Sequence, residues 1–155
     1  IFRLADYELV DASTYVKSDA SSDIKLARLF FAGDVLPHIN FDNYARNYGN
    51  GDYNYERSFE KLKDYSLKAD YFMLNCEFTS NPNLEPSEYP TFNSNEAIYK
   101  SLKDIGVDVI TTANNYCMYT GFDGLDYTID AINNAGIDNV GTQKDSSDKN
   151  IWLRI

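Results

Sequence analysis

Two segments of the sequence, SLKDIGVDVI and AINNAGIDNV, are near copies, and their glycines Gly106 and Gly136 lie thirty residues apart. In each copy a helical pattern ends at the glycine and an apolar strand pattern follows. A repeating unit of this size is typical of a β-α-β crossover, which is right-handed and builds a parallel sheet. The repeat therefore predicts an α/β fold, a mostly parallel sheet flanked by helices.

Similar patterns on both sides of the repeat extend the predicted sheet. Apolar runs predict strands over residues 25–32, 70–78, 107–112 and 137–141, and helical spacing predicts helices over 55–69, 94–105 and 124–135. Residues 79–92 form a long proline-containing loop. Asn93, with Glu96 three residues later, predicts an N-cap for the second helix. The last three strands each begin around an aspartate: Asp70, Asp108 and Asp138.

Length and charge limit the classes of function. A chain of 155 residues with 43% hydrophobic composition predicts one domain with a substantial core. The net charge of −10 excludes a nucleic-acid-binding protein, because phosphate binding requires a basic surface. No apolar run reaches the roughly 18 residues that span a membrane. Residues 1–24 read as a lead-in or linker segment, and residues 25–155 as the folded part.

Both ends of the sequence suggest that it belongs to a longer protein. The chain begins at Ile1 without a methionine, so an upstream segment is expected to have been removed. Residues 151–155 alternate like a strand, and the sequence stops there. The two cysteines, Cys76 and Cys117, lack zinc-finger spacing; we expect two reduced thiols, with one disulfide between them as the alternative.

Polar residues follow three of the predicted strands. Asp34 follows the first strand, Asn75 and Glu77 the second, and Asn114 and Asn115 the third. Ligands of open α/β sheets bind beyond the carboxyl ends of the strands, where these side chains would meet. Their oxygen atoms suit Mg²⁺, Mn²⁺ or Ca²⁺. The alternative is structural, because Asp and Asn often follow strands as helix caps and turn residues.

Other catalytic signatures are missing from the sequence. His38, the only histidine, lies four residues after Asp34 and is either a neighbour of the site or an ordinary hydrogen-bonding residue. No Ser-His-Asp or Cys-His pairing is supported, and no phosphate-binding glycine loop is present. Tyrosines are frequent around residues 44–55, where they suit either sugar stacking or simple packing.

Taken in order, the strand-end motifs resemble those of the poly-γ-glutamate capsule-synthesis (CapA-type) family. The matching stretches are FAGDVLPH (31–38), NCE (75–77), PTFN (90–93), ANNY with the glycines that follow it (113–124), and GT (141–142). The resemblance covers the chain from about Ile24 to its end. It implies the N-terminal portion of a calcineurin-like metallophosphoesterase fold, an α/β/β/α sandwich, whose C-terminal half is absent from this sequence.

The resemblance also implies roles for individual residues. It makes Asp34, Asn75, Glu77 and Asn115 the expected ligands of a divalent metal (Mn, Mg, Fe or Zn). The alternative is that this portion of the family's domain holds no metal. His38 and Tyr116 occupy the expected catalytic positions. The family has a histidine where this chain has Tyr116, and a phenol keeps its proton at neutral pH, so it cannot replace an imidazole in proton transfer. Whether the protein is an enzyme is left open.

The resemblance implies two alternative functions at the cell surface. One is a capsule-synthesis protein that acts on an anionic envelope polymer such as poly-γ-glutamate. The other is a non-catalytic module that binds the polymer or assembles with capsule-synthesis membrane proteins. Membrane attachment is expected only through an N-terminal anchor outside this sequence. Since half of the family's domain is missing, an open sheet edge and an apolar face are expected to make copies associate. An unrelated α/β domain remains the third alternative.

Overall fold

The computed structural model describes residues 27–147 of the chain. The order of elements is β1 (Leu29–Val35), α1 (Ile39–Tyr48), α2 (Glu56–Phe59), η2 (Glu60–Leu62), α3 (Lys63–Ser66), β2 (Tyr71–Cys76), α4 (Ala97–Asp104), β3 (Val109–Thr111), α5 (Gly121–Asn134) and β4 (Asp138–Val140). The strands form one parallel sheet in the order β1-β2-β3-β4. The predicted α/β class is confirmed. The lead-in 1–24 and the strand predicted at 151–155 lie outside the described range.

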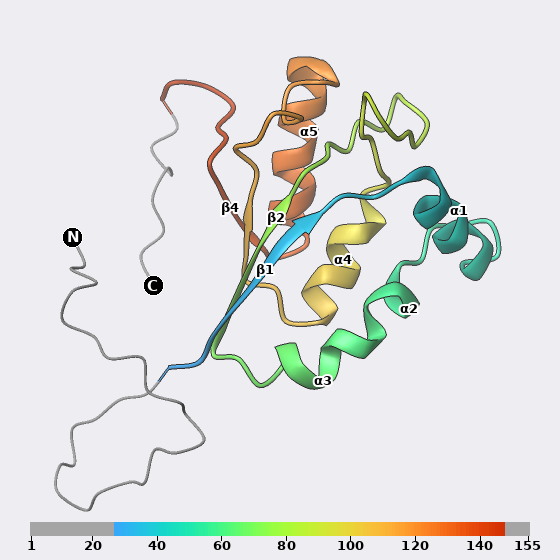
Figure 1. The fold of residues 1–155 in the computed structure, drawn as a ribbon. Helices are drawn as coiled ribbons and strands as arrows, with labels where there is room; N and C mark the ends of the chain where they lie inside the picture. Colours follow the sequence, from blue (N-terminus) through green and yellow to red (C-terminus); the bar gives the residue numbers. More distant parts are fainter. Residues whose placement is uncertain (1–26, 148–155) are drawn as a thin grey trace, which may run out of the picture.

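The core lies between the sheet and the helices, which occupy one side of it (Figure 1). Along β2, Phe72, Leu74 and Cys76 are buried while the residues between them are partly exposed. This alternation is typical of a strand with one face on the core. Helices α4 and α5 cover that face with Leu102 and Ile132, both completely buried. The predicted apolar faces of these helices are confirmed.

The aspartates that begin the strands connect neighbouring strands. The Oδ2 atom of Asp70 accepts a hydrogen bond from the backbone N–H of Arg28 at 2.6 Å, just before β1. The Oδ2 atom of Asp108 accepts one from the backbone N–H of Phe72 at 2.9 Å. Each carboxylate therefore accepts a hydrogen bond from a backbone N–H at the start of the neighbouring strand, before the hydrogen bonds between the strands begin. This accounts for the aspartate at two of the three strand starts.

Several predicted boundaries are wrong. The first strand begins at Leu29, after the described residues Ala27 and Arg28, and continues through Asp34 to Val35. The helix predicted over 55–69 is broken into α2, η2 and α3. Helix α1 was not predicted, and α5 begins at Gly121, one turn early. Asn93 is not an N-cap, because α4 begins at Ala97. The side chain of Asn93 instead forms hydrogen bonds with the long loop.

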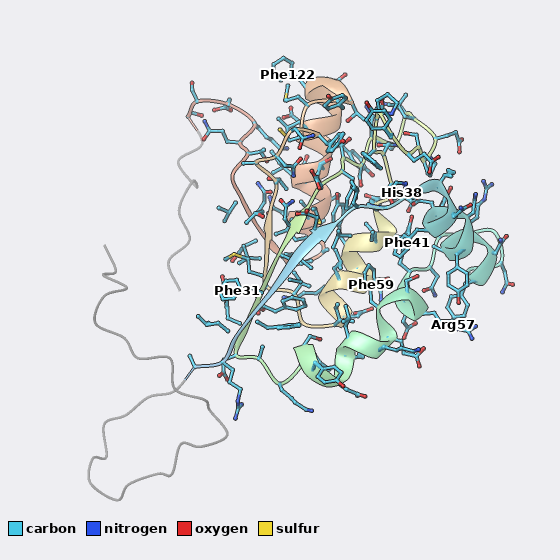
Figure 2. The ribbon with its side chains drawn as sticks, viewed as in Figure 1. Phe31, His38, Phe41, Arg57, Phe59 and Phe122 are labelled. Atoms are coloured by element: carbon cyan, nitrogen blue, oxygen red, sulfur yellow. The ribbon has the colours of Figure 1, made fainter. Side chains whose placement is uncertain are left out.

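The opposite face of the sheet carries exposed apolar side chains. Leu29 and Phe31 of β1 are 54% and 63% exposed. Figure 2 shows Phe31 pointing away from the side on which Phe41 and Phe59 lie. Among the described residues, no helix covers this face (Figure 1). An open apolar face of this kind is a candidate for contact with another protein surface.

Candidate functional site

The site lies at the carboxyl ends of the strands and depends on an irregularity in β1. The pairing of β1 with β2 shifts register between Phe31 and Asp34. Beyond the shift, Asp34 pairs with Asn75 and Val35 with Cys76. A bulge of this kind redirects the side chains that follow it. It places the carboxylate of Asp34 beside the side chain of Asn75.

Hydrogen bonds fix the amide of Asn75 at the centre of the site. Its Nδ2 donates to Oδ1 of Asp34 at 2.8 Å. Its Oδ1 accepts from Oγ1 of Thr111, the last residue of β3, at 3.1 Å. Asn114 lies next to it and donates from Nδ2 to the carbonyl oxygen of Cys76 at 2.8 Å. Three neighbouring strands therefore contribute polar groups to one cluster, as their parallel order requires.

Glu77 adds a second carboxyl group to this cluster. Its backbone N–H donates to the carbonyl oxygen of Val35 at 3.0 Å, which holds it beside the end of β1. Loss of hydration, then the negative charge of Asp34 and a hydrogen bond with that carboxyl, raise the pKa of Glu77. A cation bound beside Asp34 and Glu77 would favour the charged form of Glu77.

The structure places the other predicted site residues outside this hydrogen-bonded cluster. The side chain of Asn115 is exposed, and within residues 27–147 no hydrogen bond joins it to Asp34, Asn75 or Glu77. His38, at the N-cap position of α1, lies with its Nδ1 atom 3.3 Å from Oε2 of Glu88 in the long loop. Asn114 and Thr111, by contrast, do contact Asn75; Thr111 was not predicted, although it ends the third strand.

Tyr116 belongs to a row of aromatic rings beside the cluster. Its ring centroid lies 4.8 Å from that of Phe92 and 5.2 Å from that of Tyr119. Phe92 in turn contacts the ring of His38 edge-on at 5.3 Å. The backbone N–H of Tyr116 donates to Oδ1 of Asn114 at 3.0 Å. The phenol is therefore held close to the strand ends by packing and by the turn that starts at Asn114.

The donor atoms of the cluster suit a hard divalent cation but make an incomplete set. Asp34 and Glu77 supply two carboxyl groups. The amide nitrogen of Asn75 binds Asp34 and its amide oxygen binds Thr111, so Asn75 holds Asp34 in place and does not offer an oxygen beside it. Within residues 27–147, no three His, Cys, Asp or Glu side chains gather as a metal-binding group. Such a cation prefers about six oxygen ligands, so ligand or water oxygens would have to supply the rest.

An apolar cavity of about 280 Å³ adjoins Asp34 on the helix side of β1. Phe41 of α1, Phe59 of α2 and Leu102 of α4 line it, and Figure 2 shows the first two facing β1. The polar cluster therefore has an apolar neighbour on one side. The cavity also leaves part of β1 without close packing on its helix side.

The thiols take no part in a disulfide. Both Cys76 and Cys117 are free, as expected, and Cys76 is completely buried. Burial raises the pKa of the Cys76 thiol and keeps it protonated. This cysteine therefore packs as a small apolar residue in the core.

Comparisons with known proteins identify the family. Residues 28–153, most of the chain, match the model of the family described as bacterial capsule synthesis protein PGA_cap. A comparison with curated proteins finds no match. None of the helices in the described part is long and apolar enough to cross a bilayer. On the strength of the family match, this chain belongs to the bacterial capsule synthesis proteins of the PGA_cap family.

Proposed function

We propose that this protein works in capsule synthesis at the cell surface, where its strand-end cluster holds a divalent cation that contacts an anionic envelope polymer. Poly-γ-glutamate is the polymer expected from the resemblance to CapA-type proteins. The observation that carries the proposal is the meeting of Asp34, Asn75 and Glu77 at the carboxyl ends of β1 and β2. The family membership of the chain supports the biological setting.

The charge of the protein supports a cation between it and the polymer. The chain has a net charge of −10, and two carboxyl groups lie in the cluster itself. A polyanion that approached this cluster directly would be repelled. A divalent cation held by Asp34 and Glu77 would lower the pKa of Glu77 and neutralise the charge of the two carboxylates. Carboxylates of the polymer could then complete its set of oxygen ligands.

The packing of Tyr116 favours binding without hydrolysis. Its ring packs against those of Phe92 and Tyr119, and its hydroxyl can donate a hydrogen bond to an anionic oxygen at a position where the family's imidazole would transfer a proton. The second candidate is therefore a module that binds the polymer, or assembles with membrane proteins of capsule synthesis, without any metal. The metallophosphoesterase-like fold and an N-terminal membrane anchor outside this sequence remain part of the proposal.

Calorimetric titration of the chain with Mn²⁺ tests the metal site. We expect saturable binding that is lost in Asp34→Ala. The matched control is Asp64→Ala, because Asp64 is exposed on α3, near the opposite ends of the strands (Figure 1). Equal binding by both variants, or no binding by the unmodified chain, would refute the metal site.

Polymer binding separates the two candidates. Poly-γ-glutamate should bind the chain in the presence of Mn²⁺ and be released by a chelator. Binding that a chelator leaves unchanged would favour the metal-free module. A titration of Tyr116→Phe against the same polymer tests the phenol, because it removes one hydrogen-bond donor and leaves the ring in place. It should weaken binding about tenfold or more, the effect expected for one hydrogen bond to a charged group.

A further inference from the structure

A second cavity, separate from the strand-end cluster, is lined by charged and polar side chains. Its volume is about 260 Å³, and none of Asp34, Asn75, Glu77 or Asn115 lines it. Arg46 at the end of α1 and Tyr53 contribute to its wall, as do Glu85 in the long loop, Glu96 before α4, and Tyr127 of α5. This volume lies slightly below the roughly 300 Å³ at which pockets for drug-sized ligands begin, so a small polar ligand fits it best.

The cavity contains charges of both signs that do not pair. The guanidinium of Arg46 has no ion pair or hydrogen bond with any residue of the described range, and it lies 5.9 Å from the ring centroid of Tyr53. The carboxylate of Glu85 likewise has no ion pair or hydrogen bond in the described part of the chain. Glu96 accepts a hydrogen bond from the hydroxyl of Tyr127 at 2.6 Å through one oxygen, Oε2. Both hydrogen-bond donors and acceptors among the lining residues therefore remain available to a ligand.

A buried carboxylate lies behind one wall of this cavity. Ser94, a lining residue, donates from Oγ to Oδ1 of Asp42 at 2.5 Å. Asp42 is only 1% exposed, and its other oxygen, Oδ2, has no hydrogen-bond partner among the described residues. Burial raises the pKa of Asp42, although hydrogen bonds from Ser94 and Tyr55 oppose this. A cationic group of a ligand near Ser94 would stabilise the charged form of this carboxylate.

We infer that this cavity binds a small zwitterion, a free amino acid or a molecule with the same pair of charged groups. Arg46 binds the carboxylate of the ligand, because a guanidinium forms paired hydrogen bonds with a planar carboxylate. The ammonium of the ligand lies near Ser94 and Glu96, where the carboxylates of Glu96 and of the buried Asp42 attract it. This site does not depend on the proposed metal cluster.

Saturation-transfer NMR on the whole chain tests this inference with four probes. L-alanine carries both charges, propionate only the carboxylate, ethylammonium only the ammonium, and glucose neither. L-alanine should bind saturably, with a dissociation constant of about 1 mM or below, and the other three should bind at least about tenfold more weakly. Preferred binding of glucose would overturn the inference in favour of a polyol site, and absence of saturable L-alanine binding would also overturn it.

Three variants locate the binding. Arg46→Gln and Glu96→Gln should each weaken L-alanine binding at least about tenfold, because each removes a charge-assisted hydrogen bond. Arg57→Gln makes the same charge change on α2, where the guanidinium lies 5.7 Å from the ring centroid of Tyr48 and points outward in Figure 2, and should have no effect. If Arg57→Gln weakened L-alanine binding as much as Arg46→Gln, the loss would reflect only the change in net charge and would refute the site. Asp34→Ala should abolish Mn²⁺ binding and leave L-alanine binding intact, which distinguishes the two proposals.

Discussion

Replacing Asn93 by alanine should destabilise the protein far more than the loss of a helix cap. Asn93 is 2% exposed, and its Oδ1 accepts a hydrogen bond from the backbone N–H of Asn81 at 2.7 Å. Its Nδ2 lies 3.3, 3.1 and 3.2 Å from the carbonyl oxygens of Asn81, Leu84 and Glu85. An amide nitrogen has two hydrogens, so the side chain makes about three hydrogen bonds in total.

The expected loss follows from this count. Each hydrogen bond contributes about 1 kcal/mol net, and buried backbone groups left without partners cost more. Asn93→Ala should therefore lower the free energy of unfolding by about 3 kcal/mol. The matched control is Asn95→Ala, since Oδ1 of Asn95 accepts from the backbone N–H of Ala97 at 3.0 Å, at the true start of α4. This control should cost about 1 kcal/mol, the net contribution of one hydrogen bond.

Urea unfolding followed by far-UV circular dichroism measures both losses. Hydrogen exchange adds a local test, because the amide of Asn81 should lose protection in Asn93→Ala and keep it in Asn95→Ala. If both substitutions cost about 1 kcal/mol, the loop does not depend on Asn93 as the geometry requires. Equal protection of the Asn81 amide in the two variants would contradict the reasoning in the same way.

Three further predictions concern the site, a turn and the open face. The pKa of Glu77 is raised in the fold, so its contribution to stability is present in acid and lost as the pH rises. Glu77→Gln should therefore raise the melting temperature at neutral pH and leave it unchanged below about pH 4. An equal shift of the melting temperature at every pH would contradict the raised pKa as its cause. Gly141 and Gly51 both have positive φ, 107° and 110° respectively. A Cβ atom added at Gly141 would lie 2.7 Å from the Cβ atom of Ala113, whereas one added at Gly51 would have no neighbour within 4 Å. Alanine should therefore cost about 1 kcal/mol at Gly51 and clearly more at Gly141 in thermal unfolding. Light scattering at high protein concentration should detect association of the chain that Phe31→Ser reduces, whereas a monodisperse monomer at every concentration would argue against association through the open face.

The parallel sheet was predictable because its signals are local. The glycines that end α4 and α5, Gly106 and Gly136, have φ of 89° and 76°, which favour glycine, and apolar strands follow them directly. Helix α1 was missed because it buries a carboxylate where a helical pattern would require an apolar residue. Asp42 is accommodated there through hydrogen bonds from the side chains of Tyr55 and Ser94 and from the backbone of Asn95, none of which belongs to α1.

The site was predictable in its place and less so in its detail. Asp34 and Asn75 lie near the ends of β1 and β2 and Glu77 directly follows β2, and parallel strands bring such residues to one edge of the sheet. The register shift before Asp34 has no signal in the sequence, although it decides what this side chain faces. Asn114 and Asn115 are adjacent in the chain, and only the turn after β3 determines which of them contacts Asn75.

The order of the sheet bears on how the chain acquires its structure during synthesis. Because the strands lie in space as they lie in sequence, each new strand pairs with the one made just before it and waits for nothing made later. Asp70 and Asp108 arrive with β2 and β3, and each binds the backbone at the start of the strand already present. The protein can therefore assemble from its N-terminal side as it leaves the ribosome, one β-α unit at a time.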